Sequence, residues 1–241
     1  EIHETPGHPI VLAEWRKAGP DAPTVLIYGH YDVQPPEPLE LWDSPPFEPT
    51  VRDGNIFARG SADDNGQLFM HVKALEAHLK TTGSLPINVI VLAEGEEEVG
   101  SENLVPFVKA NKDRLACDYV VISDSNMFDD GLPSVLFSLR GMAYVEIHVK
   151  GARSDLHSGQ FGGTVRNPGN ALSQIVASFH DEHGRVAIEG FYDDVEEWGD
   201  EVREGIRGLP FDEEEYREDL EVDALAGEAG WSSLERLWIR P

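Results

Sequence analysis

Three short apolar runs in the chain do not alternate with polar residues. They are rich in β-branched residues and cover residues 24–28 (TVLIY), 87–92 (INVIVL) and 119–122 (YVVI). Such runs are typical of strands buried on both faces, as in a parallel or mixed sheet covered by helices. Between the first two, apolar residues at helical spacing predict a helix within 66–83 that ends at Gly83.

A second helix is predicted over 102–111, with Ser101 as its N-cap. Alternating strands and helices predict an α/β fold, here a three-layer domain with a mixed, mainly parallel sheet. The pattern changes further along the chain. Residues 143–151 (AYVEIHVKG) alternate as a half-exposed antiparallel strand does, and an amphipathic helix is predicted within 167–184.

These patterns predict two domains. Residues 1–138 are expected to form part of the α/β domain, and residues 139–241 a second, smaller α+β unit. The first residues read as the middle of a strand region, and the last ones (LERLWIRP) have no closing element. We therefore expect the chain to be a fragment of a longer protein.

Charge and cysteine content restrict the classes of function. The 19 basic and 45 acidic residues give a net charge of −26, which argues against nucleic acid as a partner because its phosphates require Lys and Arg. Much of the acidic excess lies in 192–223 and reads as a solvated face. No apolar stretch approaches the ~20 residues of a membrane span, and no leader peptide is visible. With Cys117 alone, no internal disulfide can form, and we expect a cytoplasmic protein that binds no membrane.

Four sequence groups place carboxylates or a histidine after an apolar run or a glycine turn. They are GHYDV (His30, Asp32), ARGSADDNG (Asp63, Asp64), AEGEEEVGS (Glu94–Glu98) and VISDS (Asp124). The carboxyl ends of strands in an α/β sheet meet at one edge, so these groups are expected to converge there. Several carboxylates with one histidine are a ligand set for Zn²⁺, Mn²⁺ or Co²⁺, whereas Ca²⁺ and Mg²⁺ prefer oxygen alone.

Each group also has a purely structural interpretation. His30 can be a satisfied histidine beside a turn, and Asp63-Asp64 a turn followed by a helix cap. The run of glutamates can be a solvated loop, and Asp124 can cap a loop. Their occurrence together, all at strand ends of one α/β unit, favours a metal site. No G-x-S-x-G, H-E-x-x-H, P-loop or clean G-x-G-x-x-G sequence competes with it.

Taken together, the stretches YGHYDVQP, ARGSADDNGQ, AEGEEEVGS, VISDS and DLHSGQFGG resemble the co-catalytic dimetal peptidases. This family includes carnosinase-like cytosolic dipeptidases, glutamate carboxypeptidases, aminoacylases and acetylornithine deacetylases, and DLHSG points to its dipeptidase branch. The resemblance implies two divalent metal ions and hydrolysis of the amide bond of dipeptides or short peptides. An N-acyl amino acid deacylase with the same metal centre, a metal-free binding module and an inactive fragment are the alternatives.

The resemblance also implies a role for each residue of these groups. The implied metal ligands are His30 and Asp124 on one ion, Asp63 between both ions, and Glu98 on the other ion. The implied catalytic set is Glu97 as general base, Asp32 as the partner of the imidazole of His30, and His157 as a residue supplied to the opposite subunit. A cis peptide is implied between Asp63 and Asp64.

The resemblance further implies that the smaller unit is an inserted lid. The role of His157 implies a homodimer formed through this unit. The family's second ion also takes a histidine from a stretch that follows this unit, and the chain ends before any such stretch. We therefore expect the 241 residues alone to be inactive, or nearly so.

Overall fold

The computed structural model of the protein describes residues 1–129, 131–136 and 139–241. It divides into two compact units, Glu1–Ser134 and Val135–Pro241, and each is described by itself. The boundary expected between 138 and 139 touches residues outside the described ranges and stays a prediction.

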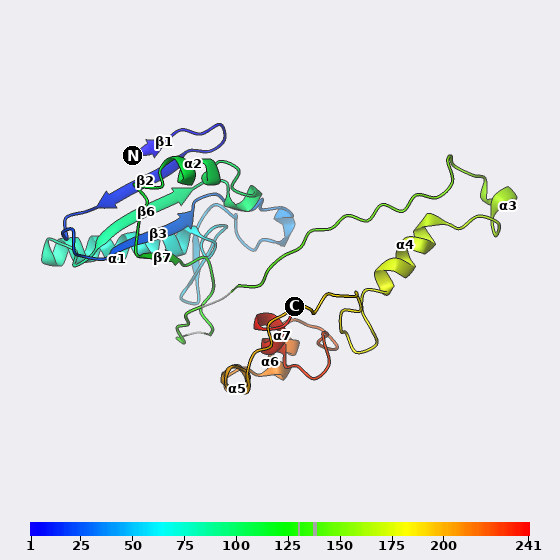
Figure 1. The fold of residues 1–241 in the computed structure, drawn as a ribbon. Coiled ribbons are helices and arrows are strands. Elements are labelled where there is room, and N and C mark those ends of the chain that lie inside the picture. The colour runs from blue at the N-terminus through cyan, green and yellow to red at the C-terminus, as the bar shows by residue number, and fades with distance from the viewer. Residues whose placement is uncertain (130, 137–138) are drawn as a thin grey trace. The chain divides into compact units, whose positions relative to one another are not determined.

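The first unit is built on a five-stranded sheet with the order β1-β2-β6-β3-β7 (Figure 1). The three predicted strands are confirmed as β3 (Thr24–His30), β6 (Asn88–Glu94) and β7 (Tyr119–Ile122). β3 pairs in parallel with both of the others, which places their carboxyl ends at the same edge. β2 (Ile10–Trp15) pairs antiparallel with β6, and β1 (Ile2–His3) with β2, so the sheet is mixed as predicted.

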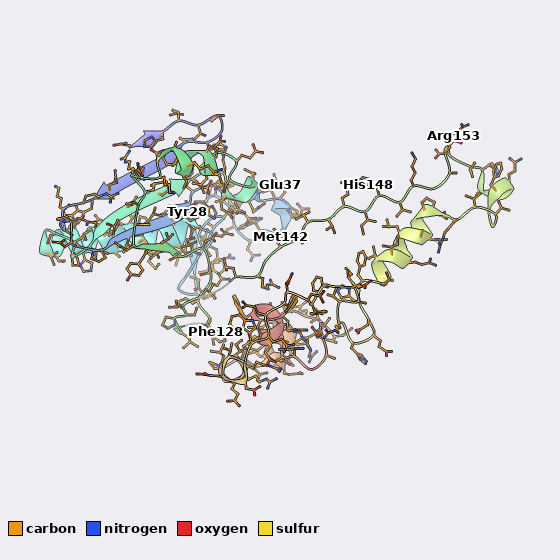
Figure 2. The ribbon with its side chains drawn as sticks, in the orientation of Figure 1. Tyr28, Glu37, Phe128, Met142, His148 and Arg153 are labelled. Atoms are coloured by element: carbon orange, nitrogen blue, oxygen red, sulfur yellow. The ribbon has the colours of Figure 1, made fainter. Side chains whose placement is uncertain are left out.

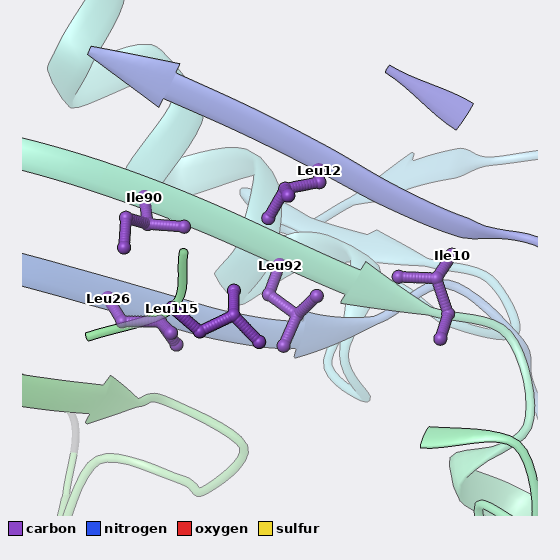
Figure 3. Packing of buried hydrophobic residues seen from close by; sticks show 6 residues of the cluster. All are labelled: Ile10, Leu12, Leu26, Ile90, Leu92 and Leu115. Carbon is purple, nitrogen blue, oxygen red and sulfur yellow. The ribbon is translucent and has the colours of Figure 1, made fainter. Parts of the chain in front are cut away.

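Helices pack on both faces of this sheet. Successive residues of a strand point to opposite sides, so one strand contributes to both packing layers. Leu26 belongs to a cluster that includes Leu104 and Phe107 of α2 (Leu104–Ala110). The next residue, Ile27, packs in a second cluster with residues of α1 (Asn65–Thr82). The buried members of the first cluster are Ile10, Leu12, Leu26, Ile90, Leu92 and Leu115 (Figure 3). This arrangement confirms the three-layer prediction and explains the absence of alternation in β3 and β6. The prediction that residues 119–122 are buried on both faces is wrong: β7 ends the sheet order and its residues are mostly exposed.

Both helices predicted for the first unit are present, but the N-cap of the second differs from the prediction. α1 ends at Gly83, whose φ of 75° is the left-handed conformation that favours glycine. The prediction of Ser101 as the cap of α2 is wrong. Asn103 is the N-cap, while Ser101 has a φ of 53° and its hydroxyl donates to the carboxylate of Glu94. The left-handed backbone at Ser101 is incompatible with the extended conformation typical of an N-cap.

Short elements complete the first unit. A hairpin is formed by β4 (Thr50–Arg52) and β5 (Asn55–Phe57), and two 3₁₀ turns cover Leu39–Leu41 (η1) and Glu97–Val99 (η2). The second of these turns follows β6 directly and carries two of the predicted site residues.

The described residues of the second unit contain helices and no strand. The helices are α3 (Ser158–Phe161), α4 (Pro168–Ala177), α5 (Asp200–Arg207), α6 (Glu213–Asp219) and α7 (Ser233–Trp238). α4 confirms a helix within 167–184, although it ends seven residues earlier. The strand predicted over 143–151 is not formed, and the side chains of Met142 and His148 project from an extended segment (Figure 2). A strand requires a hydrogen-bonded neighbour, and the described part of this unit offers none.

Candidate metal centre

Three predicted ligands meet at the carboxyl edge of the sheet. His30 is the last residue of β3, Asp124 follows β7 by two residues, and Asp63 precedes α1. One ligand atom from each lies within 4.8 Å of the others. The Nε2 atom of His30 is 3.0 Å from Oδ1 of Asp63 and 3.6 Å from Oδ2 of Asp124. Parallel strand ends therefore bring together residues that are far apart in the sequence.

The imidazole of His30 is fully buried, and its two nitrogens face different partners. Nδ1 lies 3.1 Å from the carbonyl oxygen and 3.2 Å from Oδ1 of Asp32. A proton on Nδ1 satisfies both acceptors and leaves the lone pair of Nε2 directed at the carboxylates. Burial alone would lower the pKa of His30, but the hydrogen bond to Asp32 and the charge of Asp124 outweigh it and raise the pKa.

The carboxylates of the centre carry unfavourable negative charge. The pKa of Asp124 is raised by burial and by the charge of Asp63, although His30 acts in the opposite direction. Burial likewise raises the pKa of Glu97, with further contributions from Asp124 and Glu98 that outweigh His30. A divalent cation relieves such repulsion, and one imidazole with several carboxylates is a donor set that suits Zn²⁺ or Mn²⁺. These residues therefore fit a metal ion.

The two adjacent glutamates of the η2 turn are placed differently. Oε2 of Glu97 lies 4.0 Å from Nε2 of His30, at the border of the three-residue group. Glu98 lies outside that group, and its Oε2 accepts a hydrogen bond of 2.7 Å from Nε2 of Gln34. Both backbone N–H groups donate to the carboxylate of Asp32, at 3.2 Å and 3.0 Å. Sequence reasoning did not find the contacts of Gln34 and Asp32 with this turn.

Two other glutamates of the same sequence group have structural partners that sequence reasoning also missed. Glu94 is buried and accepts hydrogen bonds from the hydroxyls of Tyr28, labelled on the sheet in Figure 2, and of Ser101. Burial and the adjacent carboxylate raise the pKa of Tyr28 well above its usual value, so the hydroxyl keeps its proton. Glu96 accepts from the backbone N–H of His8 and from Asn103. The position of Glu94 at the end of a buried strand is the one signal that indicates its burial.

Asp64 is a buried carboxylate beside the centre. The peptide bond between Asp63 and Asp64 is cis, which confirms that prediction. Oδ2 of Asp64 accepts the backbone N–H of His30 at 3.1 Å. A Cβ atom at Gly29 would lie 2.7 Å from the same oxygen, so a side chain at position 29 would force Asp64 to shift.

His157 belongs to the second unit, where it is the N-cap of α3. It lines a hollow of about 920 Å³ together with Asp155, Arg166 and Asn167. This hollow is a property of the second unit alone, and the predicted role of His157 in an opposite subunit stays a prediction.

Comparison with known proteins decides the family. The model of peptidase family M20/M25/M40 matches residues 26–231. The chain belongs to this family. The M20 chain is 33% identical over 235 residues to the human Beta-Ala-His dipeptidase, covering 97% of this chain and 46% of that protein. It is 34% identical over 241 residues to the Cys-Gly metallodipeptidase of Schizosaccharomyces pombe, covering 99% and 50%.

A solved structure agrees in fold. The M20 family metallo-carboxypeptidase from Sulfolobus solfataricus superposes with a TM-score of 0.76 and 36% identity, covering 98% of this chain and 52% of that one. The M20 chain thus spans about half the length of the relatives that it matches. The family resemblance of its sequence motifs is confirmed. No helix among the described residues has the length and apolar character needed to cross a membrane.

Proposed function

We propose that the intact protein is a metal-dependent hydrolase that cleaves the amide bond of dipeptides or short peptides. The observation that carries the proposal is the convergence of Nε2 of His30 with Asp63 and Asp124, with a carboxylate oxygen of Glu97 4.0 Å from that nitrogen. Relatives over this stretch are a Beta-Ala-His dipeptidase and Cys-Gly metallodipeptidases, which supports dipeptides as the substrate class.

The centre is proposed to hold two divalent ions, Zn²⁺ or Mn²⁺, with Co²⁺ as a further candidate. His30, Asp63 and Asp124 supply the ligand atoms that the structure groups together, and Glu98 is the proposed ligand of the second ion. When bound, such ions polarise a carbonyl group and lower the pKa of water.

The chain's own residues then have separate tasks. Glu97 accepts a proton from water at its carboxylate and returns it to the leaving amine, a function suited to a carboxyl whose pKa is already raised by burial. Asp32 keeps the proton of His30 on Nδ1, so that Nε2 stays available as a ligand. Asp63 and Asp124 provide the negative charge that holds cations at the strand ends.

A homodimer formed through the second unit, with His157 completing the site of the opposite subunit, is proposed from the family resemblance. Size-exclusion chromatography with light scattering tests the dimer. The domain boundary near 138 and a cytoplasmic location are likewise proposals, the latter supported by the single cysteine.

Glu97→Gln in the intact protein tests the general base. The substitution keeps the size of the side chain and removes the proton acceptor, so turnover of dipeptides is expected to fall by about 10²–10⁴-fold with bound metal unchanged. Glu102→Gln, a change at an exposed residue in the following segment, is the matched control and is expected to retain wild-type activity. Wild-type turnover by Glu97→Gln would contradict the assignment.

Metal analysis and a substrate panel separate the alternatives. About two ions per chain are expected, and fewer than about one would favour a metal-free binding module. Dipeptides and N-acetyl amino acids are to be compared side by side, and faster hydrolysis of the latter would make the protein a deacylase.

A further inference from the structure

The carboxylate of Asp32 contacts two separate parts of the centre. Its Oδ1 lies 3.2 Å from Nδ1 of His30 and accepts the backbone N–H of Glu97 at 3.2 Å. Its Oδ2 accepts the backbone N–H of Glu98 at 3.0 Å. One side chain therefore joins the end of β3 to the turn that follows β6.

These two N–H groups belong to the residues that open the η2 turn, Glu97–Val99. The first N–H groups of a helical turn have no partner inside the turn, so an external acceptor decides how their peptide planes are oriented. The side chain of Asp32 is only 17% exposed, and hydrogen bonds from N–H to a carboxylate are among the stronger ones in proteins. The orientation of these peptides sets the directions in which the Glu97 and Glu98 side chains leave the turn.

The residues that flank the turn have other hydrogen-bond partners. Glu96 accepts the backbone N–H of His8 at 3.0 Å and the side-chain amide of Asn103 at 2.8 Å. Ser101, which follows the turn, donates to Glu94. These bonds connect the turn to β1–β2 and α2, whereas Asp32 connects it to the histidine of the centre.

We propose that Asp32 is a positioning residue for Glu97 and Glu98 as well as for His30, and that it fixes the turn before any metal binds. The inference rests on the proposed function for the roles of the two glutamates, but the hydrogen bonds that carry it are independent of that function.

The geometry makes an Asp→Asn change at this position non-conservative. Asp32 uses one oxygen for each amide, and both donors need an acceptor. Asparagine offers one acceptor oxygen, and its NH₂ group would face the second N–H. Asp32→Asn therefore retains at most one of the two bonds, and Asp32→Ala retains neither.

Hydrogen exchange of the intact protein in EDTA, read at single-residue resolution by fragmentation mass spectrometry, tests the inference without metal or substrate. Exchange at the Glu97 and Glu98 amides is expected to accelerate about tenfold or more in Asp32→Ala, and at one or both of them in Asp32→Asn. Amides of β3 and β6 in the same sample report whether each variant is folded.

Asp118→Ala is the matched control, because Oδ2 of Asp118 accepts the N–H of Thr24 at the opposite end of β3 and alanine offers no acceptor. It is expected to accelerate exchange at Thr24 and to leave Glu97 and Glu98 unchanged. Wild-type exchange at both glutamate amides in folded Asp32→Ala would overturn the proposal.

Titration with Mn²⁺ gives a second readout. If Asp32 acts on both parts of the centre, Asp32→Ala weakens the binding of both ions, by about 10–100-fold. Weakening of one ion alone would show that Asp32 acts through His30 only and would overturn the proposal. If the wild-type protein binds no metal, the proposed function fails, and the exchange rates still decide whether Asp32 holds the turn.

Discussion

Asp124→Asn is predicted to stabilise the metal-free protein and to destabilise it relative to wild type once metal is present. The carboxylate of Asp124 is held in an unfavourable place, because burial and the charge of Asp63 raise its pKa despite the nearby His30. At the 4.8 Å limit that bounds the ligand atoms, two unit charges repel by about 3.5 kcal/mol at an effective dielectric constant of about 20.

Solvent reduces that repulsion considerably. The side chain of Asp63 is 62% exposed and His30 offsets part of the charge, so a net gain of about 1 kcal/mol is expected when Asp124 becomes neutral. For a unit of this size, that gain corresponds to a rise in Tm of about 4 °C.

Metal reverses the order of stability. An ion at about 100 times its Kd stabilises the wild-type fold by about 2.7 kcal/mol. Removing a residue that hydrogen-bonds a metal ligand weakens metal binding about 10–100-fold, and removing the ligand itself weakens it at least as much. With a Kd about 100-fold weaker, the same metal concentration only equals the Kd of the variant. Metal then stabilises the variant by only about 0.4 kcal/mol.

Differential scanning calorimetry of the intact protein in EDTA and in excess Mn²⁺ measures both effects, and the transition that metal shifts in the wild type identifies the first unit. Asp118→Asn serves as the control for a carboxylate outside the centre. A metal-induced shift of equal size in wild type and Asp124→Asn would refute Asp124 as a ligand, and a variant no more stable than wild type in EDTA would refute the electrostatic reasoning.

Three further predictions concern stability, each measured by denaturant unfolding of the intact protein. Tyr28→Phe removes a donor to the buried carboxylate of Glu94 and is expected to cost about 2 kcal/mol; an unchanged midpoint would show that water replaces the hydroxyl. In the second unit, burial alone would raise the pKa of Glu235, but hydrogen bonds from Arg203 and Ser232 lower it to about 2. The carboxylate therefore stabilises the second unit fully at pH values above the ordinary pKa of a glutamate, and this effect is lost as the pH falls toward about 2. Glu235→Gln should lower the free energy of unfolding by about 3 kcal/mol at neutral pH and flatten its dependence on acid pH. Gly83→Ala is expected to lower the free energy of unfolding by about 1 kcal/mol, because φ is 75° at this position. A Cβ atom there would meet no neighbouring atom, so no larger loss is expected.

The sequence alone determined the three-layer fold of the first unit and the edge of the sheet where its chemistry lies. Strands buried on both faces require continuous apolar runs, and the polar residues that end these runs mark the sheet edge, so the pattern by itself places His30 and Asp124 there. Those are properties of local periodicity and composition, which the amino-acid sequence contains in full.

Tertiary structure decided which of the many acidic residues face which partner. In the run from Glu94 to Glu98, one carboxylate is buried against Tyr28, Glu96 binds backbone and amide donors, and Glu97 approaches His30. A tight turn has no periodicity from which such directions can be read, because they depend on donors that other strands supply. The same reason explains the two failures: the cap at Ser101 was displaced by its left-handed backbone, and the alternation over 143–151 forms no strand without a neighbour to pair with.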